Sequence, residues 1–122
     1  MKLLILSMLA AQALAAPLDF ADALKLADAN EAALDADAKA ALMQSQDAAL
    51  RTATAGCVSL APGRLPAFTI VMELDADGRA LNSWRDSDLP MVRCVERELR
   101  NGAYRTTGKD GFFMSFVVSF TP

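Results

Sequence analysis

The chain has 122 residues, 53% of them apolar, which is enough for one ordinary domain and too few for two independent ones. Its 12 basic and 15 acidic side chains give a formal net charge of −3, so a general nucleic-acid binder is not expected. The chain has no histidine, which removes the usual general base and the commonest zinc ligand and disfavours most hydrolase mechanisms.

Residues 1–15 have the organisation of a cleavable signal peptide. Lys2 precedes the apolar run 3–9, and residues 13–15 (Ala-Leu-Ala) form the small-x-small pattern that signal peptidases require. We expect a soluble mature chain that starts at Ala16 and is periplasmic or secreted. Because the run is too short to span a bilayer and no cysteine directly follows it, neither a membrane span nor a lipid anchor is expected.

Residues 16–55 form an alanine-rich segment whose composition predicts helix. Asp19 or Asp22 could cap its start, and Gly56 fits just past its end. One long helix and a helical hairpin with a break near Asn30 are both compatible with the pattern. A narrow face of small residues could cover the domain's own sheet, or it could pair with a second copy and give a homo-oligomer.

After this segment the periodicity changes from helical to extended. Residues 56–66 contain glycine and proline and predict an irregular connection. Residues 68–74 alternate as a half-buried strand does. One face would carry Phe68, Ile70, Met72 and Leu74, and the other Thr69, Val71 and Glu73. Residues 75–78 (Asp-Ala-Asp-Gly) predict a tight turn, and a second strand follows over 79–85.

The last part of the chain predicts a helix and then a strand. The helix covers 88–101, with Ser87 or Asp88 as its cap and Pro90 in its first turn. Residues 112–120 alternate again and place phenylalanine on both faces, so they give the clearest strand pattern in the chain.

This order of elements predicts an α+β domain over residues 56–122. Its core is a β-β-α-β unit, a three-stranded antiparallel sheet with one packed helix, preceded by the long alanine-rich helix or helical hairpin of 16–55. A right-handed crossover would lay the helix of 88–101 over the large apolar face and set the third strand antiparallel beside the first. The alanine-rich segment would then suit the second face, at Val71, Val117 and Ser119.

Cys57 and Cys94 are the only cysteines. In an exported protein a structural disulfide between them is favoured over reactive thiols. Such a bridge closes a loop of roughly 38 residues and contributes about 4 kcal/mol in the chain-entropy treatment.

Three stretches of the second half resemble the TonB C-terminal domain family, and its cysteine-containing variants in particular. These are the turn 75–79 (Asp-Ala-Asp-Gly-Arg), the helical stretch 94–97 (Cys-Val-Glu-Arg) and the strand 112–120, with Cys57 as the upstream cysteine. The resemblance covers residues 56–120. It implies a periplasmic module whose exposed sheet edge pairs with an extended peptide from another envelope protein.

Seven residues are candidate partner contacts. The third strand would bind a partner peptide along its edge. The helix of 88–101 would present a row of arginines to an acidic partner. The single tryptophan would anchor a partner at the end of the second strand. A covered edge, a solvated helix face and ordinary core packing are the corresponding structural alternatives. The candidates are Phe113, Ser115, Val117, Trp84, Arg93, Arg97 and Arg100.

No catalytic, cofactor-binding or metal-binding pattern is recognisable. Asp75, Asp77 and Asp86 have the spacing of part of a calcium loop, but Ala80 stands where such a loop requires glycine. We therefore expect a non-enzymatic protein-interaction module without a cofactor. The alternative is a periplasmic inhibitor or immunity protein against an envelope-targeted toxin or hydrolase. A bare third-strand edge would favour peptide capture, whereas a covered edge with an exposed charged loop would favour inhibition.

Overall fold

The computed structural model describes residues 17–120, which form the predicted α+β fold with three α-helices and one three-stranded antiparallel sheet. The predicted signal peptide, residues 1–15, lies outside the described residues. A short 3-10 helix, Val58–Leu60, follows the second α-helix. In chain order the main elements are α1 Phe20–Ala32, α2 Ala36–Cys57, β1 Phe68–Leu74, β2 Ala80–Arg85, α3 Pro90–Leu99 and β3 Phe112–Val118.

The sheet has the order β2-β1-β3, with β1 antiparallel to both neighbours, as the crossover argument predicts. One face carries the main hydrophobic core, because alternate residues of β1 and β3 point there. α3 covers this face through Val92, Val95 and Leu99, all of them fully buried. The strand residues on this face are Phe68, Ile70, Met72, Leu74, Phe112, Met114, Phe116 and Val118.

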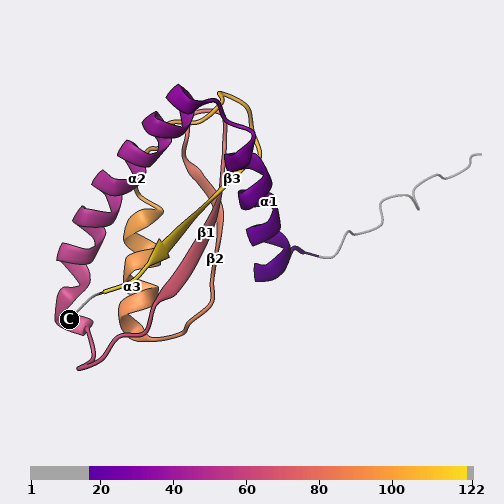
Figure 1. The fold of residues 1–122 in the computed structure, drawn as a ribbon. Coiled ribbons are helices and arrows are strands. Elements are labelled where there is room, and N and C mark those ends of the chain that lie inside the picture. Colours follow the sequence, from indigo (N-terminus) through magenta and orange to yellow (C-terminus); the bar gives the residue numbers. More distant parts are fainter. Residues whose placement is uncertain (1–16, 121–122) are drawn as a thin grey trace, which may run out of the picture.

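The alanine-rich segment is a helical hairpin whose two helices lie on opposite sides of the sheet (Figure 1). α1 packs on the second face, where Ala23 and Ala27 meet Val71 and Phe113. α2 lies beside α3 on the other side and places Leu42 in the main core. The expectation that this segment covers the second face is therefore correct for α1 and wrong for α2.

Of the two alternatives left open by the sequence, the structure shows the hairpin, and its break lies at residues 33–35, a few residues after Asn30. Asp19 caps α1 as predicted, because its side chain accepts a hydrogen bond from the backbone N–H of Asp22 at 2.8 Å. Asp35 caps α2 in the same way and accepts from Ala38 N–H at 2.7 Å. Both helices thus start where a carboxylate satisfies an otherwise unpaired backbone donor.

Two predicted helix boundaries are wrong. Gly56 does not end α2, which continues to Cys57 and passes into the 3-10 helix. α3 starts at Pro90 without a side-chain cap, since the Ser87 hydroxyl accepts from Leu89 N–H instead. Gly56 also lacks the positive φ that a helix-ending glycine commonly adopts.

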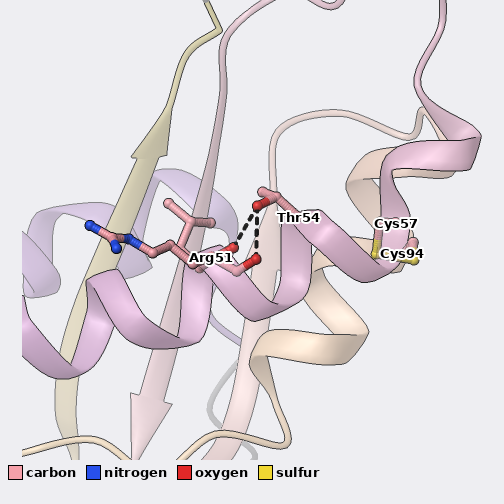
Figure 2. Close-up of a disulfide and its surroundings, with 5 residues drawn as sticks. Arg51, Thr54, Cys57 and Cys94 are labelled. Atoms are coloured by element: carbon pink, nitrogen blue, oxygen red, sulfur yellow. Dashed lines mark hydrogen bonds between the residues drawn. A yellow bond between two sulfur atoms is a disulfide. The ribbon is translucent and has the colours of Figure 1, made fainter.

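Cys57 and Cys94 form the predicted disulfide, with their Cα atoms 5.8 Å apart. Figure 2 shows the bond joining the last turn of α2 to the middle of α3. In the turn before the bridge, the Thr54 hydroxyl donates to the backbone oxygens of Leu50 at 2.9 Å and Arg51 at 3.2 Å. The alanine-rich segment is thereby fixed covalently to the β-β-α-β unit.

Candidate functional site

The outer edge of β3, where the resemblance places peptide pairing, is covered over its first half. Phe113 N–H donates to the Asn30 side-chain oxygen at 2.7 Å, and Ser115 N–H donates to a Glu31 carboxylate oxygen at 2.7 Å. The Ser115 carbonyl accepts from the Gln46 side-chain amide at 3.0 Å. Side chains of α1 and α2 therefore occupy backbone groups that a fourth strand would need.

Two aromatic candidates belong to the packing under α1. Phe113 is 8% exposed, and its ring stacks on Trp84 with the ring centroids 5.8 Å apart. The Trp84 indole N–H donates to the Leu18 carbonyl at 3.0 Å. The structure thus places both side chains against the molecule's own elements, which agrees with the core-packing alternative for the tryptophan.

Beyond these hydrogen bonds, β3 offers only a short open end. Val117 is 73% exposed and faces a shallow groove of about 230 Å³ between β3 and α2. Val117 is the only residue of β3 after Ser115 whose backbone groups point away from β1, so this end can support little strand pairing. The groove residues are Met43, Gln46, Asp47, Leu50, Ser115, Phe116 and Val117.

The outer edge of β2 is different, because its backbone is open. In an antiparallel ladder alternate residues point toward the partner strand. Asn82 and Trp84 pair with β1 in this way, so Ser83 and Arg85 direct their N–H and C=O groups outward. Within residues 17–120, no hydrogen bond reaches these outward backbone groups. Ser83 and Arg85 together present two N–H and two C=O groups, which is enough for four main-chain hydrogen bonds to an added strand.

A polar network on the α3 side holds this edge in position. The carboxylate of Glu96, a residue that is 8% exposed, accepts from the Ser83 hydroxyl and from the Arg85 guanidinium, both at 2.6 Å. Arg85 also pairs with Asp88 at 3.0 Å. The hydrogen bond to Glu96 raises the pKa of the Arg85 guanidinium above its ordinary value, so this side chain stays charged.

The three candidate arginines line the same side of α3. Arg100 donates to the Ser83 hydroxyl at 2.8 Å, which brings its guanidinium to the edge of β2. Arg93 and Arg97 are exposed, and Arg93 lies one turn before Glu96, on the side of the helix that faces β2. Glu98 lies on the other side, in the depression between α2 and α3. The arginines outnumber Glu96 and the exposed Asp88 here, so the net charge beside β2 on the α3 side is positive.

The arginines and the third strand are recognisable in the sequence, but the residues that cover the edge of β3, Asn30 and Glu31, are not. Asn30 and Glu31 are 83 and 84 residues away from the strand amides that they bind. No local pattern reports a contact at that separation. The sequence does indicate one feature of the β2 edge. Because a strand repeats every two residues, Ser83 and Arg85 must point their side chains to the same face of the sheet.

Across residues 17–120, no group of three or more histidine, cysteine, aspartate or glutamate side chains is placed to hold a metal ion. In the same part of the chain, none of the helices combines the length and the apolarity needed to cross a membrane. Comparison with protein-family models, with curated proteins and with solved structures finds no match to this chain.

Proposed function

We propose that this protein is an exported, non-enzymatic interaction module that pairs the outer edge of β2 with an extended segment of another envelope protein. The observation that carries the proposal is the open backbone of Ser83 and Arg85, set against the covered edge of β3. An open edge presents unpaired main-chain donors and acceptors that recognise any extended chain.

Two further features support this proposal. The pattern of residues 1–15 predicts export, and a disulfide such as Cys57–Cys94 persists in oxidising compartments such as the periplasm or the extracellular space. The resemblance of residues 56–120 to TonB C-terminal domains implies the same class of function, peptide pairing at a sheet edge. We assign that pairing to β2, because α1 and α2 occupy backbone groups of β3.

The proposal is tested by selecting peptides from a displayed library of random decapeptides against the mature protein. Selected peptides are then measured against Ser83→Pro and Ser83→Ala. Proline removes the N–H at residue 83, which points away from β1, so the fold retains its ladder. We expect at least a tenfold loss of affinity with Ser83→Pro and a smaller loss with Ser83→Ala, which keeps the backbone N–H and removes only the hydroxyl that contacts Glu96 and Arg100.

Val117→Pro is the matched control, since it makes the same change at the open end of β3. Binding that is lost with Val117→Pro and kept with Ser83→Pro would assign the site to β3 and overturn the assignment to β2. A library that yields no peptide for the wild-type protein would contradict the pairing function itself.

An inhibitor or immunity protein is the second candidate, and the turn between β1 and β2 favours it. Ala76 and Asp77 are exposed there, while Asp110 accepts from Ala76 N–H at 2.8 Å and Asp75 accepts from Asp77 N–H at 2.9 Å. A rigid acidic turn beside a covered β3 edge suits a target with a basic cleft. This function predicts one-to-one binding to an envelope enzyme or toxin that Asp77→Lys abolishes and Ser83→Pro leaves intact.

A further inference from the structure

Side chains alternate between the two faces of the sheet along the open edge of β2. Ser83 and Arg85 stand opposite Met72 and Ile70, which lie in the main core, so they share the face covered by α3. Trp84 points to the other face, toward α1. Directly paired residues of neighbouring strands put their side chains on the same face. A segment paired with β2 would therefore direct alternate side chains toward α3 and the intervening one toward Trp84.

The α3 side of this edge offers cationic groups with unused donors. The Arg100 guanidinium lies at the edge itself, 2.8 Å from the Ser83 hydroxyl, and that is the only hydrogen bond it makes to another residue of 17–120. Arg93 and Arg97 are exposed on the same helix. A guanidinium has five N–H donors in a planar fork, which matches a carboxylate.

The acidic groups on this side are fewer than the arginines, and both accept hydrogen bonds from Arg85. Glu96 is 8% exposed and accepts from Ser83 and Arg85, and Asp88 accepts from Arg85. Glu98 faces the depression beside α2. The Asp88 side chain is 87% exposed, but four arginines lie on this side, at positions 85, 93, 97 and 100, against two carboxylates. A paired segment would therefore meet a net positive charge on the α3 side, although the whole chain carries a net charge of −3.

The Trp84 side of the edge has a different character. A depression of about 270 Å³ lies there, lined by Pro17, Leu18, Glu73, Asn82, Ser83 and Trp84. Its carboxylate, Glu73, accepts from the Asn82 amide at 2.9 Å. An apolar side chain can pack against the leucine and the indole ring, whereas another carboxylate would meet the charge of Glu73.

From these placements we infer that the segment that pairs with β2 is acidic. Three successive residues of that segment are acidic, apolar and acidic. The two carboxylates lie opposite Ser83 and Arg85 and pair with the arginines of α3, and the central apolar side chain packs beside Trp84. This inference rests on the proposed edge pairing and adds the chemical class of the partner.

Synthetic peptides provide the test. Three nine-residue peptides with blocked ends carry at their centre Ser-Glu-Val-Glu-Ser, Ser-Gln-Val-Gln-Ser or Ser-Lys-Val-Lys-Ser, and calorimetry gives their affinities for the mature protein. We expect the glutamate peptide to bind at least tenfold more tightly than the glutamine peptide, and the lysine peptide to bind most weakly. The advantage of glutamate over glutamine should shrink as salt rises, because charge pairs at an exposed edge are screened.

Arg100→Glu and Arg51→Glu form a matched pair of variants. Both change the net charge equally, but Arg51 lies on α2, where it makes an exposed pair with Asp47. We expect Arg100→Glu to weaken the glutamate peptide at least tenfold and to favour the lysine peptide, and Arg51→Glu to change neither. Thermal unfolding of both variants checks that the fold is intact.

The possible outcomes separate the two proposals. Equal affinity for glutamate and glutamine peptides, or failure of all three peptides while library-selected peptides still bind, overturns the acidic preference and leaves the edge pairing in place. Binding that Ser83→Pro does not weaken overturns the edge pairing on β2 as well.

Discussion

Glu31 illustrates how one side chain at the edge of β3 couples charge to stability. It is half-buried and accepts a hydrogen bond from Ser115 N–H. Burial raises the pKa of Glu31 above its ordinary value of 4.5, and this effect outweighs the hydrogen bond from Ser115, which lowers the pKa. The folded state therefore holds the Glu31 proton to a higher pH than the unfolded state does.

This linkage has a definite sign. Between the unfolded and the folded pKa the native state binds more protons, so the Glu31 contribution to stability falls as pH rises through that window. Glu31→Gln keeps an acceptor for Ser115 and removes the charge. We expect its stability relative to wild type to increase as pH rises from about 4, measured by urea unfolding at a series of pH values.

Glu31→Ala is the control, because it removes the acceptor as well as the charge. It leaves Ser115 N–H unpaired at every pH and should destabilise the protein by about 1–3 kcal/mol. A difference between Glu31→Gln and wild type that stays constant over the whole pH range would contradict a burial effect on the carboxylate.

Gly78 is required by both its backbone angle and its surroundings. Its φ is +82°, and a Cβ placed there would collide with the backbone oxygen of Tyr104. Its own carbonyl accepts from Tyr104 N–H at 3.0 Å. We expect Gly78→Ala to destabilise the protein by at least about 2 kcal/mol, measured by urea unfolding.

Gly56→Ala is the opposite case within the same chain. Gly56 lies inside α2, and nothing stands within 4 Å of the Cβ that alanine would add. This variant should therefore stabilise the protein by about 0.5–1 kcal/mol. A loss of stability at Gly56 as large as that at Gly78 would show that backbone conformation is not the cause.

At the scale of the strand, β3 places alternate side chains in two different cores. Phe116 lies in the main core with 4% of its surface exposed, and its ring meets that of Tyr104 edge-on at 5.8 Å. Phe116→Ala should cost about 3–5 kcal/mol of unfolding free energy. Phe120, past the end of β3 and 42% exposed, is the comparison, and Phe120→Ala should cost much less. Equal costs would mean that the burial of the strand is misassigned.

The two sheet edges should differ in amide hydrogen exchange. Phe113 and Ser115 donate to Asn30 and Glu31, so their amides should exchange slowly, whereas the outward amides of Ser83 and Arg85 should exchange fast. NMR-detected exchange on the free protein measures both. Asn30→Ala should accelerate exchange at Phe113 and leave the β2 amides unchanged. Protected amides at residues 83 and 85 in the free protein would show that β2 is covered.

The elements that could be predicted from the sequence are those with a strong period of their own. β1, β3 and α3 alternate or repeat so clearly that their main-core residues follow from the pattern, whereas the burial of Glu96 does not. Whether the alanine-rich segment is one helix or a hairpin stayed open, and the break suggested near Asn30 was misplaced by a few residues, because no glycine or proline marks it. Asp35 was the available signal, as an N-cap residue inside an alanine-rich run. The covering of β3 by Asn30 and Glu31 depends on how the hairpin straddles the sheet, which no local preference encodes.

At the scale of the whole molecule, the disulfide ties the end of the helical hairpin to the helix that covers the main core. Cys57 and Cys94 are 37 residues apart and join α2 to α3. Reduction should lower the unfolding free energy by about 4 kcal/mol, seen as a lower urea midpoint when a reductant is present. A Cys57→Ala, Cys94→Ala double variant should unfold at the lower midpoint and should not respond to reductant. Identical midpoints with and without reductant in the wild type would contradict a stabilising bridge.

The unequal sheet edges also limit how large an assembly built on this fold can become. β2 can accept one added strand, but α1 and α2 already occupy backbone groups of Phe113 and Ser115 on the far side of β3. A sheet that incorporates this domain therefore stops at β3. If β2 adds a strand as we propose, we expect the domain to end the sheet that it joins, whether that sheet belongs to a partner or to a misfolded neighbour, rather than to extend it.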